Sequence, residues 1–135
     1  KKFDYIFLDA PAGIDAGFQL AASFAQRIVV VTLADPAAVR DAARTGQKLE
    51  LMGKHEVRVV VNRVNRKIFS TMSVTVDDVM DNTGLPLLGV VPEDPNVTLA
   101  AAFGHPLMEY TNRGAARACT AIARRLQGLS VPLSM

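Results

Sequence analysis

The sequence predicts an α/β fold in which helices cover both faces of a doubly wound, mostly parallel sheet. Short, unbroken apolar runs, typical of strands that are covered on both faces, alternate along the chain with helical patterns. The chain has 135 residues, 50% of them hydrophobic and 21% charged, which suits a folded chain. This length is enough for one domain and too short for two. We therefore expect residues 1–135 to form a single domain.

Four apolar runs are predicted to be strands. The first covers residues 3–9, is dense in aromatic and branched side chains, and leads into turn-forming residues at 10–13. We expect it to be a buried strand followed by a loop. The other runs cover residues 27–32, 57–62 and 87–91.

Helical patterns follow these runs at residues 17–24, 37–52, 76–82 and 114–126. The third pattern has clear boundary signals. Thr75 precedes it, and the Asp78 carboxylate can accept hydrogen bonds from the free amides of the first turn. Gly84 can adopt the left-handed backbone that ends helices. Alternating strands and helices imply right-handed crossovers between parallel strands.

Composition argues against several classes of protein. A net charge of +2 is too small to indicate nucleic-acid binding, and none is expected. The single cysteine, Cys119, allows neither an internal disulfide nor a cysteine-based zinc site, which favours a reducing, cytoplasmic compartment. No apolar run reaches the roughly 18 residues that span a bilayer. The first strand begins almost at once and without a methionine, so we expect a piece of a longer protein.

Two candidate site residues surround the first predicted turn. Ligands of parallel α/β sheets bind beyond the carboxyl ends of the strands. Asp9 ends an apolar run, and a buried carboxylate needs solvent, a cap or a cation, of which nucleotide-bound Mg²⁺ is the usual one there. Gly13 would let the backbone approach a phosphate. A helix-capping or turn-forming role is the alternative for Asp9.

Two further candidates follow later strands. The amide of Asn62 can donate and accept hydrogen bonds together, which suits the edge of a purine base, although a turn-forming Asn is the alternative. Pro92 and Glu93 belong to the rigid loop Pro92-Glu93-Asp94-Pro95, whose free backbone groups could meet a base or a partner. An ordinary proline-rich connection is the alternative for that loop.

Other polar residues carry weaker signals. His55 and His105 are predicted to be exposed loop residues, and no Ser-His-Asp arrangement is supported because neither follows a strand. No cluster of His, Cys or carboxylate residues has metal-site spacing. A solvated helix surface is the simplest interpretation of four arginines near the carboxyl end: Arg113, Arg117, Arg124 and Arg125.

Five blocks of the sequence are informative together. They are Asp9-Ala10-Pro11-Ala12-Gly13-Ile14, Val39-Arg40-Asp41-Ala42, Val61-Asn62-Arg63-Val64, Met72-Ser73-Val74 with Asp77-Asp78-Val79, and Pro86-Leu87-Leu88-Gly89-Val90-Val91-Pro92-Glu93-Asp94. In this order they resemble the MinD cell-division ATPases, which belong to the MinD/ParA class of deviant P-loop ATPases. The resemblance extends from about Tyr5 to Leu133 and implies a sheet of the P-loop NTPase type that lacks the P-loop strand.

The resemblance implies a role for each candidate residue, with ATP and Mg²⁺ as cofactors. Asp9 resembles the Walker B aspartate that holds Mg²⁺, and Gly13 lies in the switch that senses the γ-phosphate. Asn62 resembles the Asn that reads the adenine edge. Pro92 and Glu93 resemble the loop that closes over the base.

Two further matches and one mismatch concern partners. Arg40 and Asp41 fall near the family's surface for dimer and partner contacts, although an intramolecular ion pair is an equal alternative. The family's Thr-x-Pro-Glu after the second strand here reads Thr32-Leu33-Ala34-Asp35, which leaves partner specificity open.

The family's Lys-Gly-Gly-x-Gly-Lys-Thr phosphate loop is missing from these residues. The resemblance therefore implies a carboxyl-terminal half with no catalytic residue of its own and no activity alone. The intact parent would hydrolyse ATP to switch dimerisation and membrane association in bacterial division-site placement. It would be cytoplasmic or peripheral at the inner membrane through a segment not seen here, would bind division regulators, and would form homo-oligomers.

Two other functions remain open at this stage. A non-catalytic binding or assembly module could retain half of the fold and lack the nucleotide site. A related ATPase of the ParA class could place flagella or partition plasmids.

Overall fold

The computed structural model describes residues 2–71 and 74–133, so the start of the block at Met72-Ser73 lies outside the described residues. Its sheet is parallel and has the order β1 (Ile28–Leu33), β2 (Val57–Val64), β3 (Leu87–Pro92). In the register Ile28 lies beside Val57 and Val59 beside Leu87. The predicted α/β class with a parallel sheet is confirmed.

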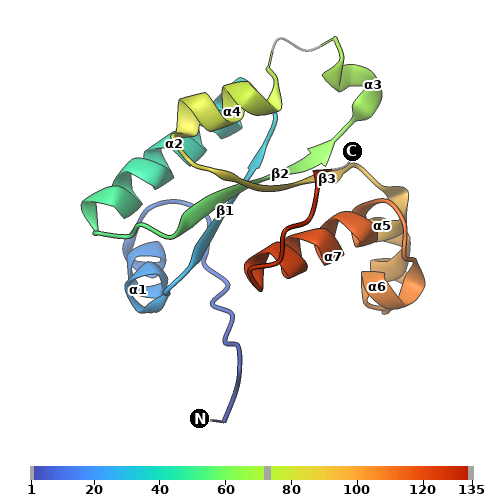
Figure 1. Cartoon of the computed structure of the whole chain (residues 1–135), viewed down its shortest axis with the longest axis horizontal. Helices are drawn as coiled ribbons and strands as arrows, with labels where there is room; N and C mark the ends of the chain where they lie inside the picture. Colours follow the sequence, from blue (N-terminus) through green and yellow to red (C-terminus); the bar gives the residue numbers. More distant parts are fainter. Residues whose placement is uncertain (1, 72–73, 134–135) are drawn as a thin grey trace.

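Helices cover both faces of this sheet (Figure 1). On one side lie α1 (Ala16–Phe24), α2 (Pro36–Leu51) and α4 (Val76–Thr83). On the other side lies α7 (Ala115–Leu126), with α5 (Pro95–Ala102) and α6 (Leu107–Tyr110) beside it. The short α3 (Arg66–Phe69) follows β2. No helix in the described part of the chain is long and apolar enough to cross a bilayer.

The central strand β2 is buried from both sides. Val59 and Val61 are fully buried and pack in one cluster with side chains of α2 and α4. Val60, between them, points to the opposite face and packs with Leu88 and with α7. This arrangement explains why the run is continuously apolar, because successive side chains of a strand point to opposite faces.

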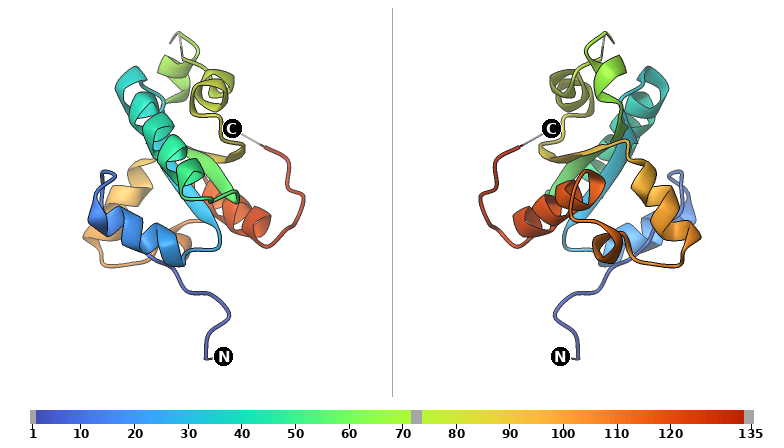
Figure 2. Two further views of the ribbon diagram at one scale, coloured as in Figure 1. Left: turned by 90° about the vertical axis from the view of Figure 1, so that its left-hand side faces the viewer. Right: turned by 90° about the vertical axis from the view of Figure 1, so that its right-hand side faces the viewer.

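The prediction of a strand at residues 3–9 is wrong. The segment has no regular secondary structure and extends away from the body of the protein (Figures 1 and 2). Its large apolar side chains, from Phe3 to Leu8, are between 48% and 83% exposed. A strand needs a hydrogen-bonded neighbour, and no described residue pairs with this segment, because it lies apart from β1, whose outer edge is unpaired.

The predicted helices are confirmed with boundary shifts of no more than one residue. Thr75 and Asp78 form the predicted capping box of α4, and Gly84 ends that helix with a left-handed backbone (φ +67°). Three short helices, α3, α5 and α6, were not predicted from the sequence patterns; the longest has 8 residues. For α5 a signal existed, because Asp94 caps it and Pro95 occupies its first turn.

Candidate functional site

The loops that follow β2 and β3 are joined through Glu93. Its backbone N–H donates to the carbonyl oxygen of Val64 at 3.0 Å. Its carboxylate accepts a hydrogen bond from Nδ2 of Asn65 at 3.2 Å and forms an ion pair with Arg63 at 3.5 Å. One acidic side chain therefore holds the carboxyl ends of two neighbouring strands together.

Asn62 lies beside this junction, within the last residues of β2 and not after the strand as predicted, and its side chain contacts the next residue. Its Oδ1 accepts a hydrogen bond from the backbone N–H of Arg63 at 2.9 Å. Arg63 has a left-handed backbone (φ +54°), which is uncommon for a residue with a side chain and often marks a functional site. The Nδ2 group of Asn62 donates no hydrogen bond within the described ranges. The turn-forming interpretation thus accounts for the oxygen and leaves the amide donor available to a ligand.

Asp94 anchors the loop that contains Pro92 and Glu93. Its carboxylate accepts a hydrogen bond from the N–H of Asn96, at the start of α5, and another from the N–H of Ala115, at the start of α7, both at 2.9 Å. These bonds, led by that from Ala115, lower the pKa of Asp94 below its usual 3.8. The prediction that the backbone groups of this loop are free is wrong for the N–H of Glu93, which donates to Val64, and for the carbonyl oxygen of Asp94, which accepts from the N–H of Val97.

The stability that Asp94 contributes is expected to be present above pH 3.8 and to be lost as the pH falls below it. The folded state holds this carboxyl ionised more strongly than the unfolded state, so protonation favours unfolding. In Asp94→Asn the side chain does not titrate. Urea unfolding at several pH values measures the free energy of unfolding of both proteins. The difference between wild type and Asp94→Asn should shrink below pH 3.8.

Asp78→Asn is the matched comparison for that prediction, because backbone and side-chain hydrogen bonds from Thr75 also lower the pKa of Asp78. It caps α4, away from the junction of the two loops. The assigned hydrogen bonds would be contradicted if the difference in free energy of unfolding between wild type and Asp94→Asn stayed constant from neutral pH to about pH 3.

Asp9 and Gly13 lie elsewhere, on one wall of a groove that runs along β1. The groove has a volume of about 660 Å³, and its lining includes residues from Leu8 to Gly13 on one side and from Ile28 to Leu33 on the other. It includes neither Asn62 nor Glu93. Asp9 is exposed. The expectation of a carboxylate at the end of a buried strand is wrong, because residues 3–9 form no strand.

Among the described residues, the surroundings of Asp9 offer Mg²⁺ a single carboxylate ligand. No group of three or more His, Cys, Asp or Glu side chains in the described part of the chain could hold a metal ion. Mg²⁺ at nucleotide sites usually has one or two carboxylate ligands, with phosphates and water supplying the rest. Asp9 therefore fits as a single ligand beside a bound nucleotide. Gly13 has φ +94° and open space where a Cβ would lie, so a close approach to its backbone is possible.

The remaining candidates are at the surface, with one exception. His55 and His105 are exposed, as predicted. Arg40 and Asp41 are exposed on α2 and form no ion pair among the described residues, so that alternative is wrong. Arg125 is not simply solvated, because it donates hydrogen bonds to the carbonyl oxygens of Leu88, Val131 and Pro132 at 2.9–3.0 Å.

Curated relatives match almost the whole chain. It is 38% identical over 133 residues to the septum site-determining protein MinD of Synechocystis, a match that covers 97% of this chain and 50% of the relative. It is 36% identical over 137 residues to MinD of Bacillus subtilis, covering 100% of this chain and 51% of the relative. The chain thus spans about half the length of these relatives. No protein-family model matches it.

Solved structures agree with these relatives. The MinD cell division protein of Aquifex aeolicus superposes with a TM-score of 0.92 at 34% identity, covering 98% of this chain and 57% of that one. The same score and identity hold for a MinC:MinD cell division protein complex of that organism, with 55% of that chain covered. A MinD of Pyrococcus horikoshii, complexed with Mg-ADP, has a TM-score of 0.78 and 24% identity over 93% of this chain and 51% of that one, a likeness that supports the fold alone.

Proposed function

From the premise that this chain is MinD-like in sequence and fold, we propose that it is the carboxyl-terminal portion of a MinD-like ATPase domain. Residues 1–135 form the part of that domain that supplies the base pocket and the Mg²⁺ aspartate. The observation that carries the proposal is the junction at Glu93, which joins the carboxyl ends of β2 and β3, where Asn62 and Pro92 lie.

Each candidate residue has a task in this proposal. Asn62 donates from Nδ2 to the edge of adenine, and Pro92 and Glu93 close the pocket over the base. Asp9 holds Mg²⁺, which when bound neutralises phosphate charge. The open space at Gly13 would let its backbone approach the γ-phosphate of a bound nucleotide. No phosphate-binding loop is present in these 135 residues, so ATP hydrolysis belongs to the intact parent.

Removal of the Asn62 side chain tests the base pocket. In a complete MinD-like protein that contains this chain, Asn62→Ala should weaken ATP binding by about 1–3 kcal/mol and erase the preference for ATP over GTP. The physical reason is that the base edge loses its hydrogen-bond partner. Calorimetric titration with both nucleotides measures the effect.

Asn82→Ala provides the control for that titration, because Asn82 only donates to the carbonyl oxygen of Asp78 within α4. It should leave both affinities unchanged. If Asn62→Ala kept the nucleotide preference of the wild type, Asn62 would be a turn residue and nothing more.

The groove along β1 is explained by the same proposal. The outer edge of β1 presents unpaired backbone groups, and the exposed apolar side chains of Val31 and Leu8 line the groove beside it. In the complete domain a further strand would pair with this edge and fill the groove between β1 and the segment that carries Asp9.

Without that strand, the chain is expected to associate with copies of itself. Unpaired strand edges and exposed apolar side chains are templates for association, so light scattering at high micromolar concentration should show a dimer or a larger oligomer. Val31→Lys, which places a charge on the exposed face of β1, should shift the protein toward monomer. A wild-type chain that stays monomeric would contradict the expectation.

The biological role follows from the relatives. They are septum site-determining proteins, and one structural neighbour is a MinC:MinD complex. We place this chain in bacterial division-site selection, with a division regulator as partner and ATP-dependent dimerisation and membrane association as the switch. It would be cytoplasmic, or peripheral at the inner membrane in the intact protein.

A non-catalytic assembly module is the second candidate. The contact between Oδ1 of Asn62 and the N–H of Arg63 favours it, because half of the amide already has a structural use. Nucleotide titration of the complete protein separates the two functions, since an assembly module would bind neither ATP nor ADP.

A further inference from the structure

The carboxyl end of β2 contains one extra residue relative to β3. In the register between these strands, Val61 lies beside Val90. Val64, three residues later, lies beside Pro92, which is only two residues after Val90. Such an insertion is a β-bulge, and bulges beside functional sites redirect a side chain. The bulge falls at Asn62 and Arg63, within the candidate site.

The packing of β2 shows what the bulge changes. Val61 and Val64 belong to the same core cluster, although strict alternation of side chains would place Arg63 on that face. Arg63 is exposed instead, and Asn62 is half-buried. Among the described residues Arg63 is also the only one other than glycine with a positive φ, +54°. The extra residue therefore keeps both polar side chains out of the core and places Arg63 in a left-handed backbone conformation.

The backbone of Arg63, rather than its side chain, holds Asn62. The N–H of Arg63 donates to Oδ1 of Asn62 at 2.9 Å. Because Oδ1 and Nδ2 are opposite ends of one planar amide, a fixed oxygen also fixes the direction of the nitrogen. The guanidinium of Arg63 pairs only with the exposed carboxylate of Glu93, at 3.5 Å, and exposed pairs of this kind contribute little.

We propose that Arg63 is the positioning residue of the base site and that it acts through its left-handed backbone, not through its charge. The inference rests on the proposed function, in which Nδ2 of Asn62 donates to the base. By holding Oδ1, the bulge orients Nδ2 before a ligand arrives, so binding does not have to order the amide. This role needs a positive φ at position 63, which Asn adopts readily and a β-branched residue rarely does.

Two substitutions that both remove the charge separate the backbone from the side chain. Arg63→Asn retains access to the left-handed conformation, and Arg63→Val does not. In a complete MinD-like protein, calorimetric titration gives the ratio of the affinities for ATP and GTP. Arg63→Asn should keep this ratio within about twofold of wild type, whereas Arg63→Val should lower it at least about fivefold. The ratio reports on the base and is not changed by a uniform loss of binding.

NMR of the labelled 135-residue chain tests the positioning without any nucleotide. A scalar coupling across the hydrogen bond, from the N–H of Arg63 to Cγ of Asn62, should be present in the wild type and in Arg63→Asn. It should be absent in Arg63→Val.

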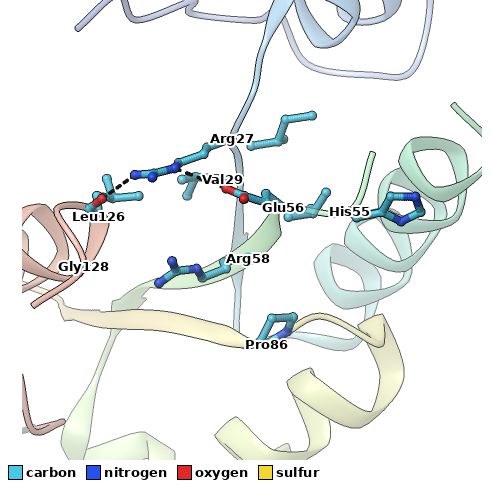
Figure 3. A pocket seen from close by; sticks show the side chains of 10 residues that line it. Arg27, Val29, His55, Glu56, Arg58, Pro86, Leu126 and Gly128 are labelled. Carbon is cyan, nitrogen blue, oxygen red and sulfur yellow. Dashed lines mark hydrogen bonds and ion pairs between the residues drawn. The ribbon is translucent and has the colours of Figure 1, made fainter. Parts of the chain in front are cut away.

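Arg58→Val is the matched control, because it makes the same change at the other end of the same strand. Arg58 lies in regular register beside Val29 and lines a pocket with Arg27 at the amino ends of the strands (Figure 3). Its substitution should leave both the coupling and the affinity ratio unchanged. An equal fall of the ratio in Arg58→Val and Arg63→Val would show a general weakening of β2 and overturn the proposal.

Three other results would also overturn it. Equal falls of the ratio in Arg63→Asn and Arg63→Val would assign the effect to the charge. A wild-type chain without the coupling would remove the contact itself, and this measurement decides if Arg63→Val does not fold. A complete protein that prefers ATP equally with and without Arg63→Val would overturn this inference alone. Binding of neither nucleotide would overturn the proposed function together with it.

Discussion

The chain alone is expected to bind ATP with a dissociation constant in the millimolar range or weaker. Addition of an amino-terminal half that carries the phosphate-binding loop is expected to tighten ATP binding by at least about 1,000-fold. The triphosphate carries several negative charges, and the proposed base site at Asn62 and Glu93 is accompanied by no phosphate-binding loop in these 135 residues. Calorimetry on the chain alone and after co-expression with the amino-terminal half of a MinD-like protein measures both affinities.

The role of Asp9 is tested in the same reconstituted protein. Asp9→Ala should abolish Mg²⁺-dependent turnover, whereas Asp4→Ala, in the same exposed segment, should not. Two results would contradict the proposal that the other half of the domain binds the phosphates. One is micromolar ATP binding by the chain alone, and the other is ATP hydrolysis by the chain alone that Asp9→Ala abolishes.

Gly114→Ala is expected to destabilise the chain by about 2–4 kcal/mol, the largest effect of any single substitution considered. Gly114 has φ +56° and ψ −125°, a backbone conformation that residues with a Cβ rarely adopt. A Cβ at this position would overlap the carboxylate of Asp94. Relief of that overlap would displace Asp94 from the N–H of Ala115 and release the start of α7. Urea unfolding measures the loss.

Gly104→Ala separates the overlap from the backbone strain. Gly104 also has a positive φ, +69°, but a Cβ there would meet no atom within 4 Å. Its substitution should cost only about 1–2 kcal/mol. A double-mutant cycle with Asp94→Ala should be non-additive at Gly114, because the two residues are in contact. If Gly114→Ala and Gly104→Ala lowered the free energy of unfolding equally, the overlap with Asp94 would not explain the effect at Gly114.

Local chemistry was sufficient to predict most elements of this fold. The continuous apolar run of β2 reflects burial on both faces, which any central parallel strand requires. The capping box at Thr75 and the left-handed end at Gly84 involve residues only a few positions apart, so the sequence contains all that they need. The candidate residues after the strands were found because parallel strands place their carboxyl ends at one edge.

Contacts between distant residues were beyond such reasoning. Asp94 was seen as part of a proline-rich loop, and its hydrogen bond to Ala115, 21 residues later, depends on where α7 packs. Glu93 was assigned to a base loop, and its contacts with Asn65 and Arg63 depend on the register between β2 and β3. Neither position in the sequence indicates which backbone groups will lie opposite it.

The segment at residues 3–9 shows the same limit most clearly. Its apolar composition indicates a strand, and that indication concerns side chains alone. A strand also needs a neighbour for its backbone N–H and C=O groups, and in this structure the edge of β1 and the segment remain apart. Local pattern thus determined the type of each buried element, whereas hydrogen-bond pairing across the fold determined whether a candidate strand formed.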